Sequence, residues 1–254
     1  MAKSFNDFSK YYKGLILIFI LLLFWEIAVE FDFISNLVLP KPSKILKDGI
    51  IMLSARVFYI NFFGTLYNWF FAFIVGMSIG LFLGFLAGIN RQIEYVILPL
   101  SAFIRSIPPV ALFPVFLILI GPGKLPIIIA GIIGVIIYVF PIAHQAAESS
   151  RIKYSDLSHV LAFNRTDFIK IFIIPSTIIN SIISSRIAAS YLFSVCIGGE
   201  IIIGGKHGIG AAILEYSEKY RLEEAYFYII VAGILGLLID LSFAQLQKSF
   251  SNKT

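Results

Sequence analysis

The sequence predicts an all-α membrane protein with about six transmembrane helices, and two observations carry this prediction. Apolar residues make up 59% of the 254 residues and charged residues only 14%, and the mean hydropathy is +0.91. A soluble domain averages ~45–50% apolar and ~25% charged residues, so a soluble fold of this size could not cover its core with so few charges. The apolar residues also come in runs of ~20, the length of helix that crosses a bilayer core of ~30 Å. A disordered chain, a nucleic-acid-binding domain and nearly every soluble enzyme are excluded.

The first apolar run follows Lys3, Lys10 and Lys13, in the manner of a signal peptide. It is longer than a signal core and no small-residue cleavage site follows it, so it is predicted to stay in the protein as a span. Five further runs follow, separated by charged or turn residues. The chain is therefore predicted to be a single transmembrane domain, 1–254, with spans at 14–31, 62–89, 94–120, 125–143, 175–203 and 225–246.

The segment between the first two spans contains two prolines, Pro40 and Pro42, which exclude a helix interior there and predict a turn at 38–43. Residues 45–59 then place apolar side chains at helical spacing among charged ones. This pattern predicts a helix lying on the membrane surface, with an ordinary solvated helix as the alternative.

The second span carries four glycines on one face, spaced four residues apart: Gly76, Gly80, Gly84 and Gly88. Small residues at this spacing let a second membrane helix approach closely. The glycines are therefore interpreted as a packing surface rather than as groups that contact a substrate.

The third span is interrupted by Arg105 and by the pair Pro108-Pro109. Consecutive prolines break a helix, and such a break persists in a membrane only where protein or a water-lined path satisfies the backbone. A charge at this depth is costly unless it faces a cavity or a partner. Arg105 is interpreted as bracing the broken helix against backbone carbonyls, and a position in a solute pathway is the alternative.

The segment 144–172 is the one long polar connection between spans. Ser155 is predicted to cap a helix that begins at Asp156, and Asn164 to end it. Thr166 or Asp167 is predicted to cap the second short helix. The apolar residues of the first helix fall on one face: Leu157, Val160 and Leu161. Such a helix suits a groove in another protein, with a helix lying on lipid as the alternative.

The fifth span contains Arg186, Glu200 and several serines, and the sixth contains Asp240. Arg186 and Glu200 are ~21 Å apart along a straight helix, so they cannot pair with each other. Serines in membrane helices often bond only to their own backbone, which leaves their role in a pathway open.

Several of these stretches together resemble the permease subunit of bacterial ATP-binding-cassette importers, in the branch that handles nitrate, taurine and alkanesulfonates. The resemblance covers roughly residues 25–250 in order. The stretches that carry it are Val38-Leu-Pro-Lys-Pro-Ser43, Pro99-Leu-Ser-Ala-Phe-Ile-Arg-Ser-Ile-Pro-Pro-Val-Ala111, Arg186-Ile-Ala188, Gly199-Glu200 and Gly208-Ile-Gly210.

These permeases also share a cytoplasmic signature of Glu-Ala-Ala, three residues, Gly, nine residues and Ile-x-Leu-Pro. The same spacing is occupied here by Asp156-Leu-Ser158, Ala162 and Phe172-Ile-Ile-Pro175, with different residues at most positions, whereas the literal Gln145-Ala-Ala-Glu148 lies too far before Pro175. The resemblance implies that this loop docks on the ATPase. Its predicted contact residues are Asp156, Leu157, Ser158, Ala162, Phe163, Asn164 and Pro175.

The resemblance further implies the fold of type I importer permeases and a place in the bacterial inner membrane. Two permease copies, identical or paralogous, would form the pathway, two cytoplasmic ATPase subunits would drive it, and an extracytoplasmic binding protein would deliver the solute. The solute would be of the nitrate, sulfonate or taurine type, or a vitamin or precursor such as riboflavin or a thiamine precursor.

Lys and Arg are spread almost evenly over the predicted loops on both sides of the membrane. The prediction that both termini are cytoplasmic therefore depends on the ATPase-docking loop.

Candidates for the pathway or its gate are Arg105, Ser106, Pro108, Pro109, Ser184, Ser185, Ser194 and Glu200. No catalytic residue, cofactor, metal site or nucleic-acid partner is expected. The three histidines lie far apart, and Gly123-Lys124 is followed by Leu125, so it does not complete a phosphate-binding loop. ATP would be bound by the partner subunit.

The alternative function is a small proton-coupled carrier that uses Glu26, Glu200 or Asp240. An intramembrane enzyme is a third class, but the sequence lacks a catalytic cluster for it.

Overall fold

The computed structural model describes residues 2–36 and 38–251, with the side chains of residues 2–13, 15, 159, 184 and 251 outside the description. The chain divides into two compact units. The first comprises Met1–Tyr59 and Ala212–Ile230, and the second comprises Ile60–Ala211 and Val231–Thr254. Each unit is described by itself.

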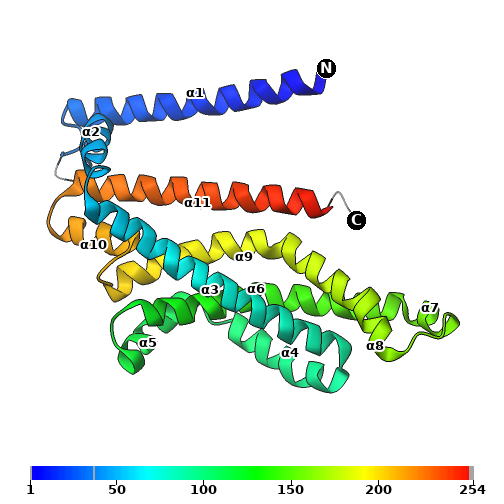
Figure 1. Cartoon of the computed structure of the whole chain (residues 1–254). Helices are drawn as coiled ribbons and strands as arrows, with labels where there is room; N and C mark the ends of the chain where they lie inside the picture. The colour runs from blue at the N-terminus through cyan, green and yellow to red at the C-terminus, as the bar shows by residue number, and fades with distance from the viewer. Residues whose placement is uncertain (1, 37, 252–254) are drawn as a thin grey trace. The chain divides into compact units, whose positions relative to one another are not determined.

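The described residues form helices and no strand, which confirms the all-α prediction (Figure 1). In chain order the helices are α1 (Ala2–Glu30), α2 (Pro42–Met52), α3 (Arg56–Ile89), α4 (Arg91–Arg105), η1 (Pro109–Leu112), α5 (Phe113–Ile120), α6 (Lys124–Lys153), α7 (Ser155–Val160), α8 (Arg165–Phe168), η2 (Ile169–Ile173), α9 (Ile174–Ile203), α10 (Ile209–Glu218) and α11 (Leu222–Ser251).

Among the described residues, five helical stretches are long and apolar enough to cross a membrane: Arg56–Ile89, Lys124–Lys153, Arg165–Ile183, Ser185–Ile203 and Leu222–Phe250. A bent pair, Arg91–Arg105 with Pro109–Ile120, raises the number to six if it counts as one span. About six transmembrane segments are therefore confirmed, whereas the single-domain assignment and the individual span limits stay predictions.

The break in the bent pair has a local cause. The two arms meet at 85°. Pro108 has φ −60° and ψ 126°, the extended conformation that a residue preceding another proline is forced to adopt. Pro109 then starts the short helix η1. The predicted interruption of the third span thus follows directly from Pro108-Pro109.

In the first unit, the predicted turn at 38–43 leads into α2, whose first turn is held by a carboxylate from α1. Glu26 accepts hydrogen bonds from the backbone nitrogen of Ser43 (3.0 Å) and from its hydroxyl (2.6 Å). These contacts satisfy donors that a helix start leaves without an intrahelical partner. The predicted helix at 45–59 is wrong in extent, because α2 ends at Met52 and α3 begins at Arg56.

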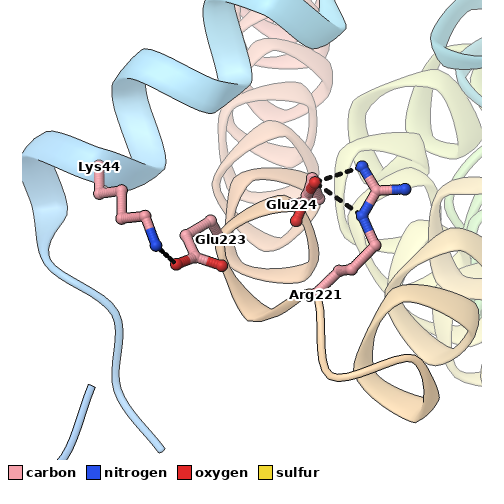
Figure 2. A network of polar contacts seen from close by, with 4 residues as sticks. All are labelled: Lys44, Arg221, Glu223 and Glu224. Carbon is pink, nitrogen blue, oxygen red and sulfur yellow. Dashed lines mark hydrogen bonds and ion pairs between the residues drawn. The ribbon is translucent and has the colours of Figure 1, made fainter. Parts of the chain in front are cut away.

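The start of α11 is joined to α2 within the same unit, as Figure 2 shows. Lys44 donates a hydrogen bond to Glu223, which raises the pKa of Lys44. One residue further, Glu224 accepts from Arg221, whose guanidinium lies 4.9 Å from the ring centre of Tyr216. Two carboxylates in the first turn of α11 also suit the positive end of the helix dipole.

The second unit is built on α6 and α9, which lie side by side, and on the glycine face of α3. Cβ atoms placed on Gly76, Gly80, Gly84 and Gly88 would lie 2.6, 3.0, 2.6 and 2.4 Å from the Cβ atoms of Val135, Val139, Ala143 and Ala147, respectively. The glycines therefore form a packing surface against α6, as interpreted from the sequence.

Replacing Gly84 with valine is expected to destabilise the protein by about 1–3 kcal/mol, because overpacking forces neighbouring groups apart. Even a Cβ at this position would lie 2.6 Å from the backbone oxygen of Phe140, which cannot rotate away. Gly233→Ala in α11 is the control, since nothing lies within 4 Å of its Cβ position. Thermal unfolding in detergent measures both, and equal melting temperatures for Gly84→Val and wild type would contradict this packing.

Candidate translocation and coupling sites

The segment that was predicted to dock on another protein lies at one end of α6 and α9 (Figure 1). The helix α6 continues to Lys153, ten residues past the predicted span limit at 143, because its face bearing Ala143, Ala147 and Ser150 stays buried. The short helix α7 follows, then α8, η2 and α9 in direct succession. The segment is thus a helix-turn-helix, in agreement with the sequence pattern.

The caps of this segment differ from the prediction. The hydroxyl of Ser155 does not cap α7, because it donates to the carbonyl of Ile152 (3.0 Å) and to Asp156 (3.3 Å). Asn164 caps the next helix: its Oδ1 accepts from the backbone nitrogen of Asp167 at 2.8 Å. An asparagine with non-helical φ and ψ before a first turn is a strong N-cap, and this overrides its tendency to end a helix.

The end of α7 explains one departure from the family signature. The backbone nitrogen of Phe163 donates to the carbonyl of Ser158 (3.0 Å), and Ala162 between them has φ +51°. This is the helix-ending motif that normally places glycine in the left-handed conformation. The signature has Gly at the position that Ala162 occupies, so alanine adopts here a backbone conformation that costs an L-residue ~1–2 kcal/mol.

Changing Ala162 to glycine is expected to stabilise this segment by about 1 kcal/mol, because the left-handed strain disappears. The matched control is Ala102→Gly in α4, an exposed helical position where glycine should cost ~0.5–1 kcal/mol. Hydrogen exchange of the α7 amides should slow in the first variant. Faster exchange there would show that the conformation of Ala162 is not strained.

The apolar face of α7 is uncovered. Leu157, Val160 and Leu161 are 42%, 82% and 54% exposed. Beneath them the segment is held by rings from Tyr154, Phe163 and Phe168, whose centres lie 4.9, 5.8 and 5.8 Å from that of Phe172. Of the other predicted contact residues, Asp156, Ala162, Asn164 and Pro175 are exposed, and Ser158 and Phe163 are half-buried. A base of packed aromatic rings therefore presents an apolar surface that the described residues leave exposed.

A cavity of about 350 Å³ opens at the break in the third span, next to Arg105, Ser106, Pro108 and Pro109. Tyr138 of α6 and Tyr191 of α9 complete its wall, with ring centres 4.7 Å apart. Among the described residues, the guanidinium of Arg105 makes no hydrogen bond to a backbone carbonyl, and its role as a brace stays a prediction. The structure places this cation at the cavity.

A second cavity, of about 340 Å³, shares Ile142 with the first and extends toward the helix-turn-helix. Four of its six lining residues are polar, and they come from both helices: Gln145 and Ser149 of α6, Ser176 and Asn180 of α9. None of these four was predicted from the sequence as a site residue. The sequence did contain a signal for them, because polar side chains spaced four residues apart on each helix indicate one hydrophilic face.

The serine candidates divide into two groups. Ser106 and Ser185 donate to backbone carbonyls of their own helices, those of Ala102 (3.0 Å) and Ile182 (2.6 Å). Ser194 is exposed, and the side chain of Ser184 lies outside the described residues. Local bonding of this kind satisfies the hydroxyl without a ligand.

Glu200 does not line either cavity. Its carboxylate is fully buried and accepts hydrogen bonds from Thr65 (2.7 Å), Asn68 (3.0 Å) and the backbone nitrogen of Gly210 (3.0 Å). A Cβ on Gly208, whose φ is +148°, would lie 2.4 Å from Cδ of Glu200. The pair Gly208-Ile-Gly210 thus allows the backbone to close over this carboxylate, and Glu200 joins α3 to the turn before α10.

Arg186 and Asp240 form a pair that the sequence did not reveal. Nε and a terminal nitrogen of Arg186 each donate to one carboxylate oxygen of Asp240 at 2.7 Å, and Ser190 adds a contact of 3.3 Å. The residues lie 54 positions apart on α9 and α11, so only the packing of the two helices brings them together. Each neutralises the charge that the other carries into the span.

The described residues form a polytopic membrane protein with a broken span beside a cavity and an exposed apolar helix face at one end of α6 and α9. The chain belongs to the family of binding-protein-dependent transport system inner membrane components, which matches residues 76–254.

Relatives of known name agree with this family. The chain is 24% identical over 236 residues to the putative aliphatic sulfonates transport permease protein of Bacillus subtilis, covering 92% of this chain and 84% of the relative. It is 29% identical over 179 residues to the bicarbonate transport system permease protein of Synechococcus elongatus (69% and 63%). It is 24% identical over 257 residues to the nitrate import permease protein of Synechocystis (96% and 90%).

Solved structures show the same fold. An inward-facing methionine ABC transporter aligns with a TM-score of 0.63 at 16% identity, over 78% of this chain and 99% of that one. An amino acid ABC transporter aligns with a TM-score of 0.60 at 20% identity, over 87% and 99%. The chain is therefore a permease subunit of an ABC importer, a multi-pass membrane protein whose family works with an ATPase and a binding protein. No comparison favours a secondary carrier.

Proposed function

We propose that the chain conducts a small anion past the two neighbouring cavities while an ATPase subunit docks on the apolar face of α7. In this proposal a second permease copy, identical or paralogous, completes the pathway in a bacterial inner membrane. Both termini lie on the cytoplasmic side, where the ATPase meets α7. The chain has no catalytic site and no cofactor of its own, since ATP is bound and hydrolysed by the partner.

The observation that carries the docking step is the exposed face of Leu157, Val160 and Leu161 on a rigid aromatic base. An amphipathic helix with this arrangement fits a hydrophobic groove in a partner. Because α8, η2 and α9 follow one another without a loop, a force on the segment passes directly into the helix that lines both cavities.

The class of solute is supported by Arg105 and by the relatives. The named relatives are permeases for aliphatic sulfonates, bicarbonate and nitrate, all of which are anions. In the described part of this chain, Arg105 is a cation at the cavity without a hydrogen-bonded or ion-paired partner. A guanidinium presents several donors in a plane that matches the oxygens of such groups.

Changing Leu157 to aspartate is expected to release the ATPase, because a charge in an apolar groove must be desolvated without a partner. Co-purification of the ATPase from detergent extracts measures the effect. Tyr220→Asp is the control, since Tyr220 is 86% exposed and lies outside the segment. Solute uptake that persists after the ATPase has been removed would overturn the docking role.

Replacing Arg105 with alanine is expected to lower anion uptake about 10- to 100-fold, since a hydrogen bond to a charged group contributes ~1.5–3 kcal/mol. Uptake into proteoliposomes measures the loss, and ATP hydrolysis by the assembled complex shows whether docking is intact. Ser106→Ala is the matched control, because its hydroxyl bonds only to its own helix. Unchanged uptake with Arg105→Ala would remove this residue from the pathway.

A further inference from the structure

Three potential metal ligands from two helices meet in the second unit. Glu94 lies in the first turn of α4, and His144 and Glu148 lie in α6. Their ligand atoms, one from each side chain, all lie within 4.8 Å of one another. Residues four apart share one face of a helix, so His144 and Glu148 point together toward Glu94.

The centre of this cluster is a buried nitrogen without a hydrogen-bond partner. His144 is 7% exposed, and its Nε2 atom makes no hydrogen bond. The atom faces Oε1 of Glu94 at 3.3 Å. Burial without a hydrogen-bond partner is costly for a polar atom, and a neutral imidazole nitrogen can donate its lone pair to a cation.

The charges around the cluster also favour a cation. Two carboxylates lie against the imidazole, and the only basic side chain paired with them in the described residues is Arg151, at 4.0 Å from Glu148. Arg151 also donates from Nε to the carbonyl of Gly88 at 3.0 Å, which holds it at the edge of the cluster. The negative charge is therefore only partly compensated.

We propose that Glu94, His144 and Glu148 bind one divalent transition-metal ion, of which Zn²⁺ is the probe, with water completing the coordination. One imidazole nitrogen and two carboxylate oxygens suit Zn²⁺ or Mn²⁺, while Mg²⁺ and Ca²⁺ prefer oxygen ligands alone. Zn²⁺ holds such ligands at ~2.0–2.2 Å, so the three atoms draw together by about 1 Å on binding. The ion joins the start of α4 to α6.

A small cavity provides a route to the site. It has a volume of about 130 Å³, and its lining includes Ser101, Pro141 and His144 together with Arg105, which also lines the first cavity. An entry path to the ligands is a requirement for a metal site that loads after folding. The wide spacing of the three histidines predicts no metal site, but this site needs only one of them and draws its other ligands from glutamates.

The test uses the full chain, purified with its co-purifying subunits, stripped with a chelator and dialysed against Zn²⁺ at pH 7. The expected result is one Zn²⁺ per chain with micromolar or tighter affinity. His144→Ala and Glu94→Gln should each weaken binding at least 10-fold. The control is His207→Ala, which removes an exposed histidine from the turn before α10 and should leave binding unchanged.

Glu94→Gln keeps the shape of a half-buried side chain, so its elution in size-exclusion chromatography shows whether the variant is folded. A folded Glu94→Gln protein that binds Zn²⁺ like wild type would overturn the proposal. The absence of binding in wild type would overturn it as well, and so would loss of binding in His207→Ala alone. The readout does not involve transport, so it stands apart from the proposed function.

Discussion

A charge inside a membrane span needs a partner, and this requirement organises the second unit. Arg186 and Asp240 neutralise each other through two hydrogen bonds of 2.7 Å. Glu200 is surrounded by three donors. Both arrangements join helices that are distant in sequence, so these few charged residues also hold separate helices together. The two proposed ligand sites lie where, in the described residues, a polar group lacks a hydrogen-bond partner: Arg105 and Nε2 of His144.

The features that the sequence predicted depend on local covalent chemistry or on regular spacing. Pro108-Pro109 breaks a helix wherever it occurs, and four glycines at intervals of four lie on one face in any helix. The helix-turn-helix also follows from a short-range pattern. The ends of α7 and α8 were harder to predict. Ser155 and Asn164 can each form local hydrogen bonds in several ways, and only the backbone conformation decides between them.

The wall of the first cavity and the partners of Glu200 were harder to predict from the sequence, because these residues come from different helices. Tyr138 and Tyr191, which form one wall of the first cavity, are separated by the whole helix-turn-helix. Glu200 was placed in the pathway because it is a charge within a span, yet its donors lie on α3 and in the turn before α10. One sequence without an alignment does not reveal such pairings, since nothing in the local pattern relates residue 65 to residue 200.

The contact between α3 and α6 has a period of four residues on both helices. A contact that repeats in this way does not by itself determine how the two helices are aligned along each other. Sliding α3 by one turn would set each glycine against the next residue in the series on α6 and leave the shape of the interface almost unchanged. The hydrogen bond from Arg151 to the carbonyl of Gly88 lies at the end of this series and helps to remove the degeneracy. The bonds from Thr65 and Asn68 of α3 to Glu200 act in the same direction. A few polar contacts thus select one register from several that packing alone tolerates.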